Sequence, residues 1–309
     1  MSGVNLLYAR YQLRDLDLAE SFMADFGLIV ASRSTDKLYM RGSGVFPFVY
    51  EAVRGESDKF LGVGFEVSSA EDLDRLANLP GSSAVETVTD PGGGRRVRMR
   101  TPDGVEIDAV NSFTSSERLK GRDIISLNTS VIKHRVNAPV RITRDIAVVN
   151  KFGHFVLHVS DHDATVAWFK DRLGMIASDY MASPDTPNEP YGTFLRFDMG
   201  DAFVDHHCLF ILGTPDPGIH HISFELDDID AIMASHDYLH DCGHIPDVGV
   251  GRHLMGSQIF DYWRDPFGFR VEHYSDGDVV NNWHKPSTFT GTAEETTQWG
   301  AEPPSEFFQ

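Results

Sequence analysis

The sequence has little cysteine, few basic residues for its length and no long apolar run. Its two cysteines, Cys208 and Cys242, stand in no redox or metal-binding spacing, so we expect no disulfide framework and a reducing, cytoplasmic location. No segment approaches the ~20 apolar residues of a membrane helix, and the N-terminus lacks a signal-peptide pattern. A net charge of −19 argues against a nucleic-acid partner, because phosphates would be repelled.

Histidine is missing from most of the first half of the chain. None precedes His134, and all but one of the 14 histidines follow residue 153. The length of 309 residues is typical of two domains. The asymmetry therefore predicts two halves of similar build, of which only the second carries chemistry.

Two segments, 8–28 and 154–175, show the same predicted order of elements. In each, an alternating strand leads through an acidic turn into a helix. Asp17 and Asp163 are plausible N-caps for these helices, because an aspartate oxygen can accept from a free backbone amide there.

The same pattern of strand, turn and helix recurs in 60–76 and 219–233, and a strand, Pro-x-Gly turn and second strand recur in 97–110 and 260–274. The chain thus predicts four βαβββ modules. A module of this size cannot bury its sheet alone, so we expect an α+β fold in which paired modules form two domains, each a curved mixed sheet around a cavity. The modules span 4–55, 56–112, 150–213 and 216–275.

These modules set the predicted domain boundaries. We expect a metal-free N-terminal domain over 1–112, a polar connector over 113–149 that passes into a β-rich segment, a catalytic domain over 150–275 and a tail over 276–309. The tail is expected to run over the surface. Its possible anchors are the aromatic residues Trp283, Trp299, Phe307 and Phe308.

Three residues at equivalent places in the second pair of modules form a candidate metal site. His154 opens the first strand of module three, His221 lies in the matching strand of module four, and Glu272 lies in the last strand of that module. Strands hold side chains rigidly and could bring these three together. Two imidazoles and one carboxylate leave open positions, which suits Fe(II) or Mn(II), whereas structural zinc favours four closed ligands.

The first pair of modules serves as an internal control. Leu7 or Tyr8 corresponds to His154, Gly62 to His221 and Asp108 to Glu272. Both histidines are missing there, so we expect no metal in the first half.

Two other histidines compete with the chosen ligands. His220 and His221 are adjacent and should point to opposite faces of a strand, and the polar neighbours of His221 favour it as the ligand. His158 shares a face with His154 but lies two pleats away, so it is the weaker candidate.

The segments GHFVLHV, HHISFEL and GRHLMGSQIFDYWRDPFGFRVEHY resemble the type I extradiol ring-cleavage dioxygenases of the vicinal oxygen chelate superfamily. The resemblance covers nearly the whole chain. It implies four βαβββ modules in two domains and a metal bound by His154, His221 and Glu272.

The same resemblance implies three further roles. His207 matches an acid/base histidine, with His206 as the alternative if the register slips. Tyr262 matches a tyrosine that hydrogen-bonds substrate or the adjacent oxygen, and His253 matches a histidine of the substrate pocket. A neutral histidine is well suited to accept a proton from a diol near neutral pH.

The implied activity is cleavage of a catechol-type aromatic diol by dioxygen, next to the diol, as in aromatic hydrocarbon catabolism. Fe(II) is the expected metal, and Mn(II) serves in some members. The family also implies a homo-oligomer. Two alternatives stay open: a glyoxalase-type isomerase of the same superfamily, which would need a fourth protein ligand, and a metal-free ligand-sequestering protein of the bleomycin-resistance type, which would be shorter.

Overall fold

The structure, a computed structural model, describes residues 3–123, 125–292, 294–304 and 307. Its first half contains two units of one strand, one helix and three strands. The first unit consists of β1 (Gly3–Leu13), α1 (Leu16–Asp25), β2 (Ile29–Arg33), β3 (Lys37–Arg41) and β4 (Tyr50–Arg54). The second consists of β5 (Lys59–Val67), α2 (Ala70–Ala77), β6 (Glu86–Thr87), β7 (Arg95–Arg100) and β8 (Glu106–Asn111).

The second half repeats this order. The third unit consists of β9 (Phe152–Val159), α3 (His162–Leu173), β10 (Met175–Ala182), β11 (Pro190–Phe197), the short β12 (Val204–Asp205) and β13 (Leu209–Gly213). The fourth consists of β14 (Gly218–Glu225), α4 (Ile229–Asp241), β15 (Ile245–His253), β16 (Ile259–Arg264) and β17 (Arg270–Ser275). The tail adds β18 (Val279–Val280), β19 (Thr288–Phe289), a 3-10 turn (Glu294–Thr296) and β20 (Thr297–Gly300).

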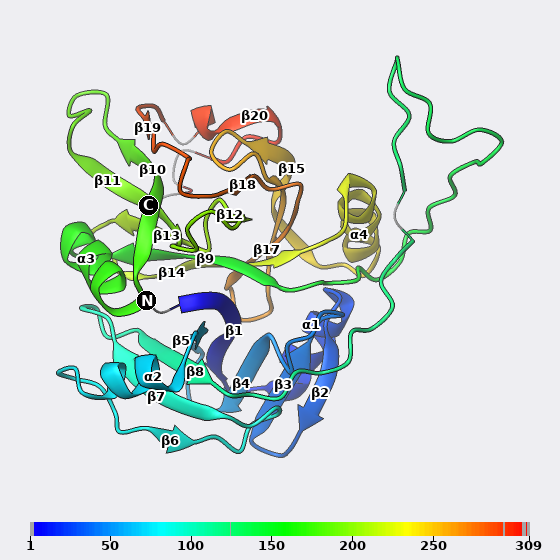
Figure 1. Cartoon of the computed structure of the whole chain (residues 1–309). Coiled ribbons are helices and arrows are strands. Elements are labelled where there is room, and N and C mark those ends of the chain that lie inside the picture. Colours follow the sequence, from blue (N-terminus) through cyan, green and yellow to red (C-terminus); the bar gives the residue numbers. More distant parts are fainter. Residues whose placement is uncertain (1–2, 124, 293, 305–306, 308–309) are drawn as a thin grey trace.

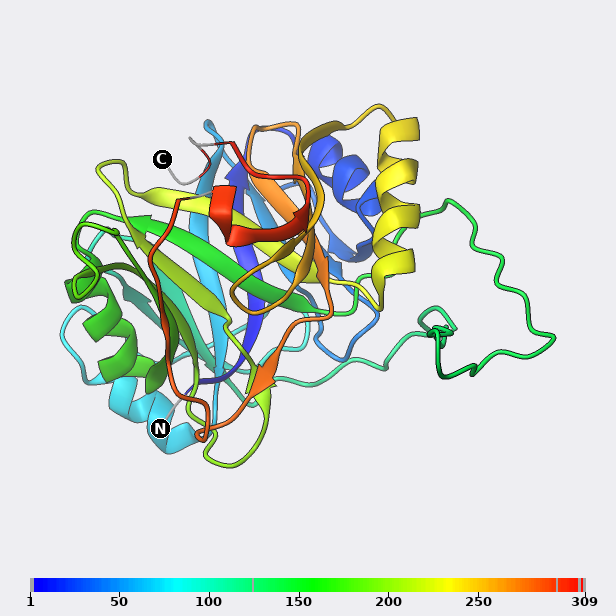
Figure 2. The same cartoon turned by 90° about the horizontal axis from the view of Figure 1, so that it is seen from above.

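The strands form two large mixed sheets that lie against each other (Figures 1 and 2). The first has the order β2-β3-β4-β1-β5-β8-β7-β6, and the second has the order β19-β10-β11-β13-β9-β14-β17-β16-β15-β20. In both, the first strands of two successive units, β1 with β5 and β9 with β14, pair antiparallel at the centre. The predicted α+β fold of four modules is confirmed.

The two halves share one apolar core. Phe65 of β5 packs its ring within 6.0–6.3 Å of the rings of Phe155, Phe169 and Phe197 from the second half. Aromatic pairs at this spacing add attraction beyond their burial. We propose that the domain boundaries follow the two sheets, although the shared core makes the halves one packed body.

The helix N-caps differ from the prediction by two residues. Asp15 caps α1 by accepting from the amides of Asp17 and Leu18, and Asp161 caps α3 by accepting from the amide of Ala164. Asp17 and Asp163 instead lie in the first helical turn, where a negative charge suits the helix dipole. When two aspartates stand two residues apart, the sequence does not reveal which one has the extended backbone of a cap.

The connector also departs from the prediction. Within the described part of 113–149 there is no helix or strand, so the expected β-rich segment is not present. Its alternating apolar residues find no strand of this chain to pair with, and the segment extends away from the body beside α4 (Figures 1 and 2). Among the described residues, no helix is long and apolar enough to cross a membrane.

Candidate metal centre and active site

Three neighbouring strands at the centre of the ten-stranded sheet bring the predicted ligands together. In the register of β9, β14 and β17, His154 lies opposite Ser223, and Ser223 lies opposite Glu272. His221 precedes Ser223 by two residues and so faces the same side. Glu272 Oε2 lies 2.9 Å from His154 Nε2 and 3.3 Å from His221 Nε2, and the two Nε2 atoms are 3.3 Å apart.

The chemistry of this cluster fits a divalent metal ion. All three side chains are buried, and their ligand atoms lie within 4.8 Å of one another. The second carboxylate oxygen of Glu272 is buried with no hydrogen-bond partner among the described residues. Burial alone would raise the pKa of Glu272, but the charge of His154 and the hydrogen bonds of His154 and His221 hold it well below its usual range. A buried carboxylate facing two imidazoles is the donor set of an open, non-structural site.

The expected opposition of His220 and His221 is wrong, because β14 carries a β-bulge at this point. Between the pairs Ile219–Leu157 and His221–Val156 the strand contains one extra residue, His220. A bulge of this kind lets two successive side chains turn to one side. The ring of His220 accordingly lies beside His221, with their Nδ1 atoms 2.6 Å apart, and also beside His158. Its Nε2 contacts the carbonyl oxygen of Phe307 rather than the carboxylate of Glu272.

A second histidine pair has the same arrangement. His206 and His207 also follow one another, and their Nδ1 atoms are 3.1 Å apart. His207 lines the cavity beside His154, with ring centroids 4.7 Å apart, whereas His206 Nε2 lies 2.8 Å from Asp179 Oδ2. In both pairs the structure therefore places the second histidine at the cavity and the first behind it.

Asp179 fixes the proton positions in the second pair. Burial would raise its pKa, but hydrogen bonds from His206 and Ser287 lower it, so Asp179 is an ionised acceptor. With His206 neutral, it donates through Nε2 and accepts at Nδ1, and His207 carries its proton on Nδ1. Burial and the neighbouring imidazole of His154 lower the pKa of His207 well below its usual value. His207 is therefore neutral with a bare Nε2.

Tyr262 and His253 complete the polar side of the cavity. Their side chains share a hydrogen bond of 2.8 Å, and His253 Nε2 lies 3.7 Å from Glu272 Oε1. Burial raises the pKa of Tyr262 well above its usual value, so its hydroxyl keeps its proton. Tyr262 lies opposite Glu272 in the register of β16 and β17, which is why the ten-residue spacing brings them together.

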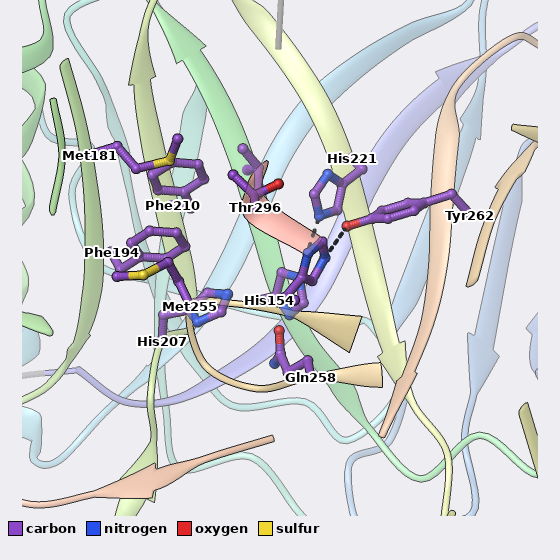
Figure 3. A pocket seen from close by; sticks show the side chains of 12 residues that line it. His154, Met181, Phe194, His207, Phe210, His221, Met255, Gln258, Tyr262 and Thr296 are labelled. Atoms are coloured by element: carbon purple, nitrogen blue, oxygen red, sulfur yellow. Dashed lines mark hydrogen bonds between the residues drawn. The ribbon is translucent and has the colours of Figure 1, made fainter. Parts of the chain in front are cut away.

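The opposite wall of the cavity is apolar, as Figure 3 shows. Sequence reasoning missed this wall and also missed Asp179, because neither has a motif. Ser223, a polar neighbour of His221 on β14, forms hydrogen bonds through its hydroxyl with both His154 and Glu272. Besides the residues above, the lining consists of Val156, Met181, Phe194, Phe210, Met255, Gln258 and Thr296.

The C-terminal tail closes the site instead of only crossing the surface. Its strands β19 and β20 pair with β10 and β15, and Thr296 reaches the cavity. Phe307 is buried against His220 and Tyr262, as an anchor should be. Trp283, 79% exposed, and Trp299, 43% exposed, are not buried anchors, because each packs only at the surface. Phe308 lies outside the described residues.

The first half contains a counterpart of the site in which arginine stands near the carboxylate. The register pairs Tyr8 with Gly64 and Gly64 with Asp108, so Tyr8 and not Leu7 corresponds to His154. At Gly62, the equivalent of His221, a Cβ atom would lie 1.7 Å from a backbone oxygen, so no side chain fits. Asp108 accepts two hydrogen bonds from Arg98, at 2.7 and 3.0 Å.

Comparison with known proteins agrees with this geometry. Residues 151–273 match the model of the Glyoxalase/Bleomycin resistance protein/Dioxygenase superfamily. The match runs from β9 to β17 and contains all three candidate ligands. Over 96% of the chain and 88% of the relative, the sequence is 26% identical to Metapyrocatechase 2 of Cupriavidus necator. It is 24% identical to an iron-dependent extradiol dioxygenase of Rhodococcus jostii, over 91% of the chain and 92% of the relative.

A solved structure shares the fold of the whole chain. The Mn(II)-bound glyoxalase from Novosphingobium aromaticivorans superposes with a TM-score of 0.82 and 23% identity, covering 99% of this chain and 94% of that one. At this identity the likeness establishes the arrangement of both halves and not the reaction. Both half-chains thus share the fold of this solved structure, and the activity must be argued from the site.

Proposed function

We infer that this protein is a metal-dependent extradiol dioxygenase, which opens a catechol-type ring with dioxygen next to the diol. The convergence of His154, His221 and Glu272 in one buried cluster carries this inference. Metapyrocatechase 2 and the iron-dependent extradiol dioxygenase, which align over nearly the whole chain, support it. We propose that these three residues hold the metal. The bound ion would act as a Lewis acid that favours the deprotonated diol and would bring dioxygen beside it.

The residues of this chain divide the remaining work. We propose that His207, neutral and bare at Nε2, accepts a proton from one hydroxyl of the diol and returns it later in the reaction. Tyr262 and His253, joined by their hydrogen bond, would orient the diol oxygen nearest to Glu272. General acid–base help of this kind contributes about 10²- to 10⁴-fold to a rate.

The cavity walls favour an apolar ring. Met181, Phe194, Phe210 and Met255 face the space where the ring would lie, and no lysine or arginine is among the described residues that line it. A carboxylate on the ring would be desolvated there without a partner, which is costly. We therefore propose catechols with hydrogen or small alkyl substituents as substrates, in preference to catechols that bear a carboxylate.

For the metal we propose Fe(II). Two imidazoles and a carboxylate with open positions are typical of non-haem Fe(II) oxygenases. Mn(II) prefers similar ligands, and the Mn(II)-bound structural relative keeps it as the second candidate. Cys208 is buried and Cys242 exposed, neither in a disulfide, which supports a reducing, cytoplasmic location for a protein of this kind.

The decisive experiment is anaerobic loading with Fe(II) or Mn(II), followed by oxygen uptake and detection of a yellow ring-fission product. The panel contains catechol, methylcatechols and a carboxylated catechol. We expect one oxygen consumed per ring opened with the alkyl-substituted diols. If no diol supports oxygen uptake by either loaded form, the dioxygenase proposal is wrong.

A glyoxalase-type isomerase is the alternative that the Mn(II)-bound glyoxalase structure raises. Such a site would need a fourth protein ligand. Among the described residues, the cluster has only its three members. The same loaded protein, offered a hemithioacetal, should therefore form no product.

A further inference from the structure

A carboxylate, a thiol and an imidazole from the two halves of the chain meet where α1 lies beside α4 (Figures 1 and 2). Asp25 is the last residue of α1, Cys242 is the C-cap of α4, and His244 directly precedes β15. Gly243, whose φ of 80° is left-handed, turns the chain between Cys242 and His244. One ligand atom of each side chain lies within 4.8 Å of those of the other two. No spacing in the sequence predicts this group, because His244 follows Asp25 by 219 residues.

Contacts with neighbouring side chains hold the three groups in place. His244 Nε2 lies 2.9 Å from Asp25 Oδ2, and the ring of His244 packs edge-on against Phe22 with centroids 5.0 Å apart. The hydroxyl of Tyr238 donates to Asp25 Oδ1 at 3.3 Å and also lies beside the thiol of Cys242. The orientation of each group is therefore set by the fold before any ligand binds.

The helix ends favour a cation at this place. Both α1 and α4 end here, and the free carbonyl groups of a helix C-terminus carry a partial negative charge. Asp25 adds a full negative charge at the helix end that disfavours one, and the last residues of α1, FMAD, include no basic side chain. The imidazole of His244 offsets this charge only when it is protonated. A bound cation would offset the carboxylate and both helix ends together.

The three ligand types indicate which cation fits. Cysteine, histidine and aspartate are all ligands of zinc, and a thiolate selects zinc over Mg(II), Ca(II) and Mn(II). A thiolate and a carboxylate together also balance the two positive charges of the ion. The side chains of Asp25 and His244 are 30% and 19% exposed, and Cys242 is exposed. Water can therefore reach the fourth position of a tetrahedral ion.

We propose that Asp25, Cys242 and His244 bind one Zn(II) ion, which joins α1 of the first half to α4 of the second. The ion would lie between the halves, outside both the cluster around Glu272 and its arginine-filled counterpart. Mn(II) and Fe(II) stand at the weak end of the affinity order. Protein loaded with either ion and freed of excess should therefore keep only the ion held by Glu272. This proposal does not depend on the proposed function.

The first test uses Co(II), because its bond to a thiolate gives a charge-transfer band in the near ultraviolet. The three members of the cluster around Glu272 carry no thiol, so the band reports only the proposed site. The full chain with His221→Ala, kept anaerobic and reduced with a phosphine, is titrated with Co(II). We expect the band to grow up to one equivalent and to disappear when Zn(II), which has no such band, is added.

Substitution of the ligands should remove this signal. In the same background, Cys242→Ser should abolish the band. His244→Ala should weaken Co(II) binding by more than the roughly 10- to 100-fold that follows loss of a residue that only supports a ligand.

Matched controls change neighbours of the same type. His240→Ala removes another exposed imidazole at the end of α4, and Cys208→Ala removes the other thiol of the chain, which is buried. Both variants should keep the band and the affinity for Co(II).

A second measurement uses the wild-type chain, so it does not depend on the folding of any variant. Cys242 is exposed and Cys208 is buried, so iodoacetamide should label Cys242 first. Zn(II) at ~10 times its dissociation constant should slow this labelling about tenfold, because only the unbound site reacts. Mass spectrometry of the labelled peptide gives the rate, and Mg(II) at the same concentration should not change it.

Two results would overturn the proposal. One is the absence of the charge-transfer band, or a band that survives Cys242→Ser. The other is labelling of wild-type Cys242 at the same rate with and without Zn(II). Either would leave Asp25 and His244 as an ion pair that only joins the two halves.

Discussion

Asp179 lies two hydrogen bonds from the cavity, yet its exchange for asparagine should impair the reaction. The wild-type carboxylate can only accept, so it forces His206 to donate and leaves His207 Nε2 bare. In Asp179→Asn the backbone amide and hydroxyl of Ser287 still require an acceptor at Oδ1. The new amide nitrogen therefore faces His206 Nε2. This nitrogen donates to His206, so the proton of each imidazole moves to its other ring nitrogen. His207 then presents an N–H at Nε2, where it should accept a proton.

The size of the effect follows from the hydrogen bond that is lost. To regain a bare Nε2 on His207, His206 would have to carry its proton on Nε2 again. That N–H would then face the N–H of the new amide, so the hydrogen bond between position 179 and His206 would be lost. A hydrogen bond to a charged group contributes about 1.5–3 kcal/mol. Because ~1.4 kcal/mol corresponds to a factor of ten, we expect kcat to fall about 10- to 100-fold. The upper limit is the whole acid–base contribution, about 10⁴-fold.

The assay is steady-state ring opening by the metal-loaded variant, with kcat and KM measured on the preferred catechol. We expect kcat to fall while KM and the metal content stay near wild type, since the cluster of His154, His221 and Glu272 and the apolar wall are unchanged. His206→Gln is the informative control. The ionised Asp179 would hold the glutamine amide nitrogen and turn its oxygen toward His207, which preserves the required tautomer. His206→Gln should therefore retain more activity than Asp179→Asn, although position 206 is nearer the cavity.

Either of two results would refute this reasoning. Full activity in Asp179→Asn would mean that the proton on His207 does not matter. A greater loss in His206→Gln than in Asp179→Asn would mean that His206 acts by packing alone.

Three further outcomes follow from the site and its surroundings. His221→Ala should lose the metal by elemental analysis, whereas His220→Ala should retain most of it; equal loss would place His220 among the ligands. The loaded wild type should hold one metal ion per chain, and a second tight site would contradict the arginine-filled first half. Burial and the charge of Arg270 lower the pKa of His158 to about 4 from 6.5. Below pH 6.5 His158 becomes protonated in the unfolded chain before it does so in the folded chain, so the free energy of unfolding decreases as the pH falls toward 4. His158→Leu should reduce that acid loss by up to about 2 kcal/mol in denaturant titrations, allowing for partial solvent screening. An unchanged acid slope would show that His158 does not contribute.

The four modules, the equivalent positions within them and the convergence of the three candidate ligands could be predicted from the sequence, because each rests on periodicity and spacing. Strand alternation and the Pro-x-Gly turns are local, and equivalent positions in repeated units occupy equivalent places. Glu272 could be found since it closes a hairpin whose register brings Tyr262 opposite it. Gly62 and Asp108 could be matched to their counterparts for the same reason.

The features that could not be predicted depend on contacts between distant segments or on a single irregular residue. The bulge at His220 breaks the two-residue alternation, and nothing in the letters HHISFEL marks the extra residue. Asp179 reaches His206 only through the pairing of β10 with β11 and the fold of the tail over Ser287. The apolar wall is likewise assembled from residues far apart in sequence.

The contrast between the halves lies in the partner that each supplies to its buried carboxylate. A buried carboxylate needs a positive partner, because an unpaired one would be severely desolvated. At Asp108 that partner is Arg98, which belongs to the strand position that Tyr262 occupies in the second half. With a fixed guanidinium beside it, Asp108 is satisfied by the fold itself. At Glu272 the corresponding residue is a neutral tyrosine, and one carboxylate oxygen is left without a hydrogen bond among the described residues. Glu272 instead faces two imidazoles, which can give up their protons so that a bound cation becomes its positive partner, as a metal site requires.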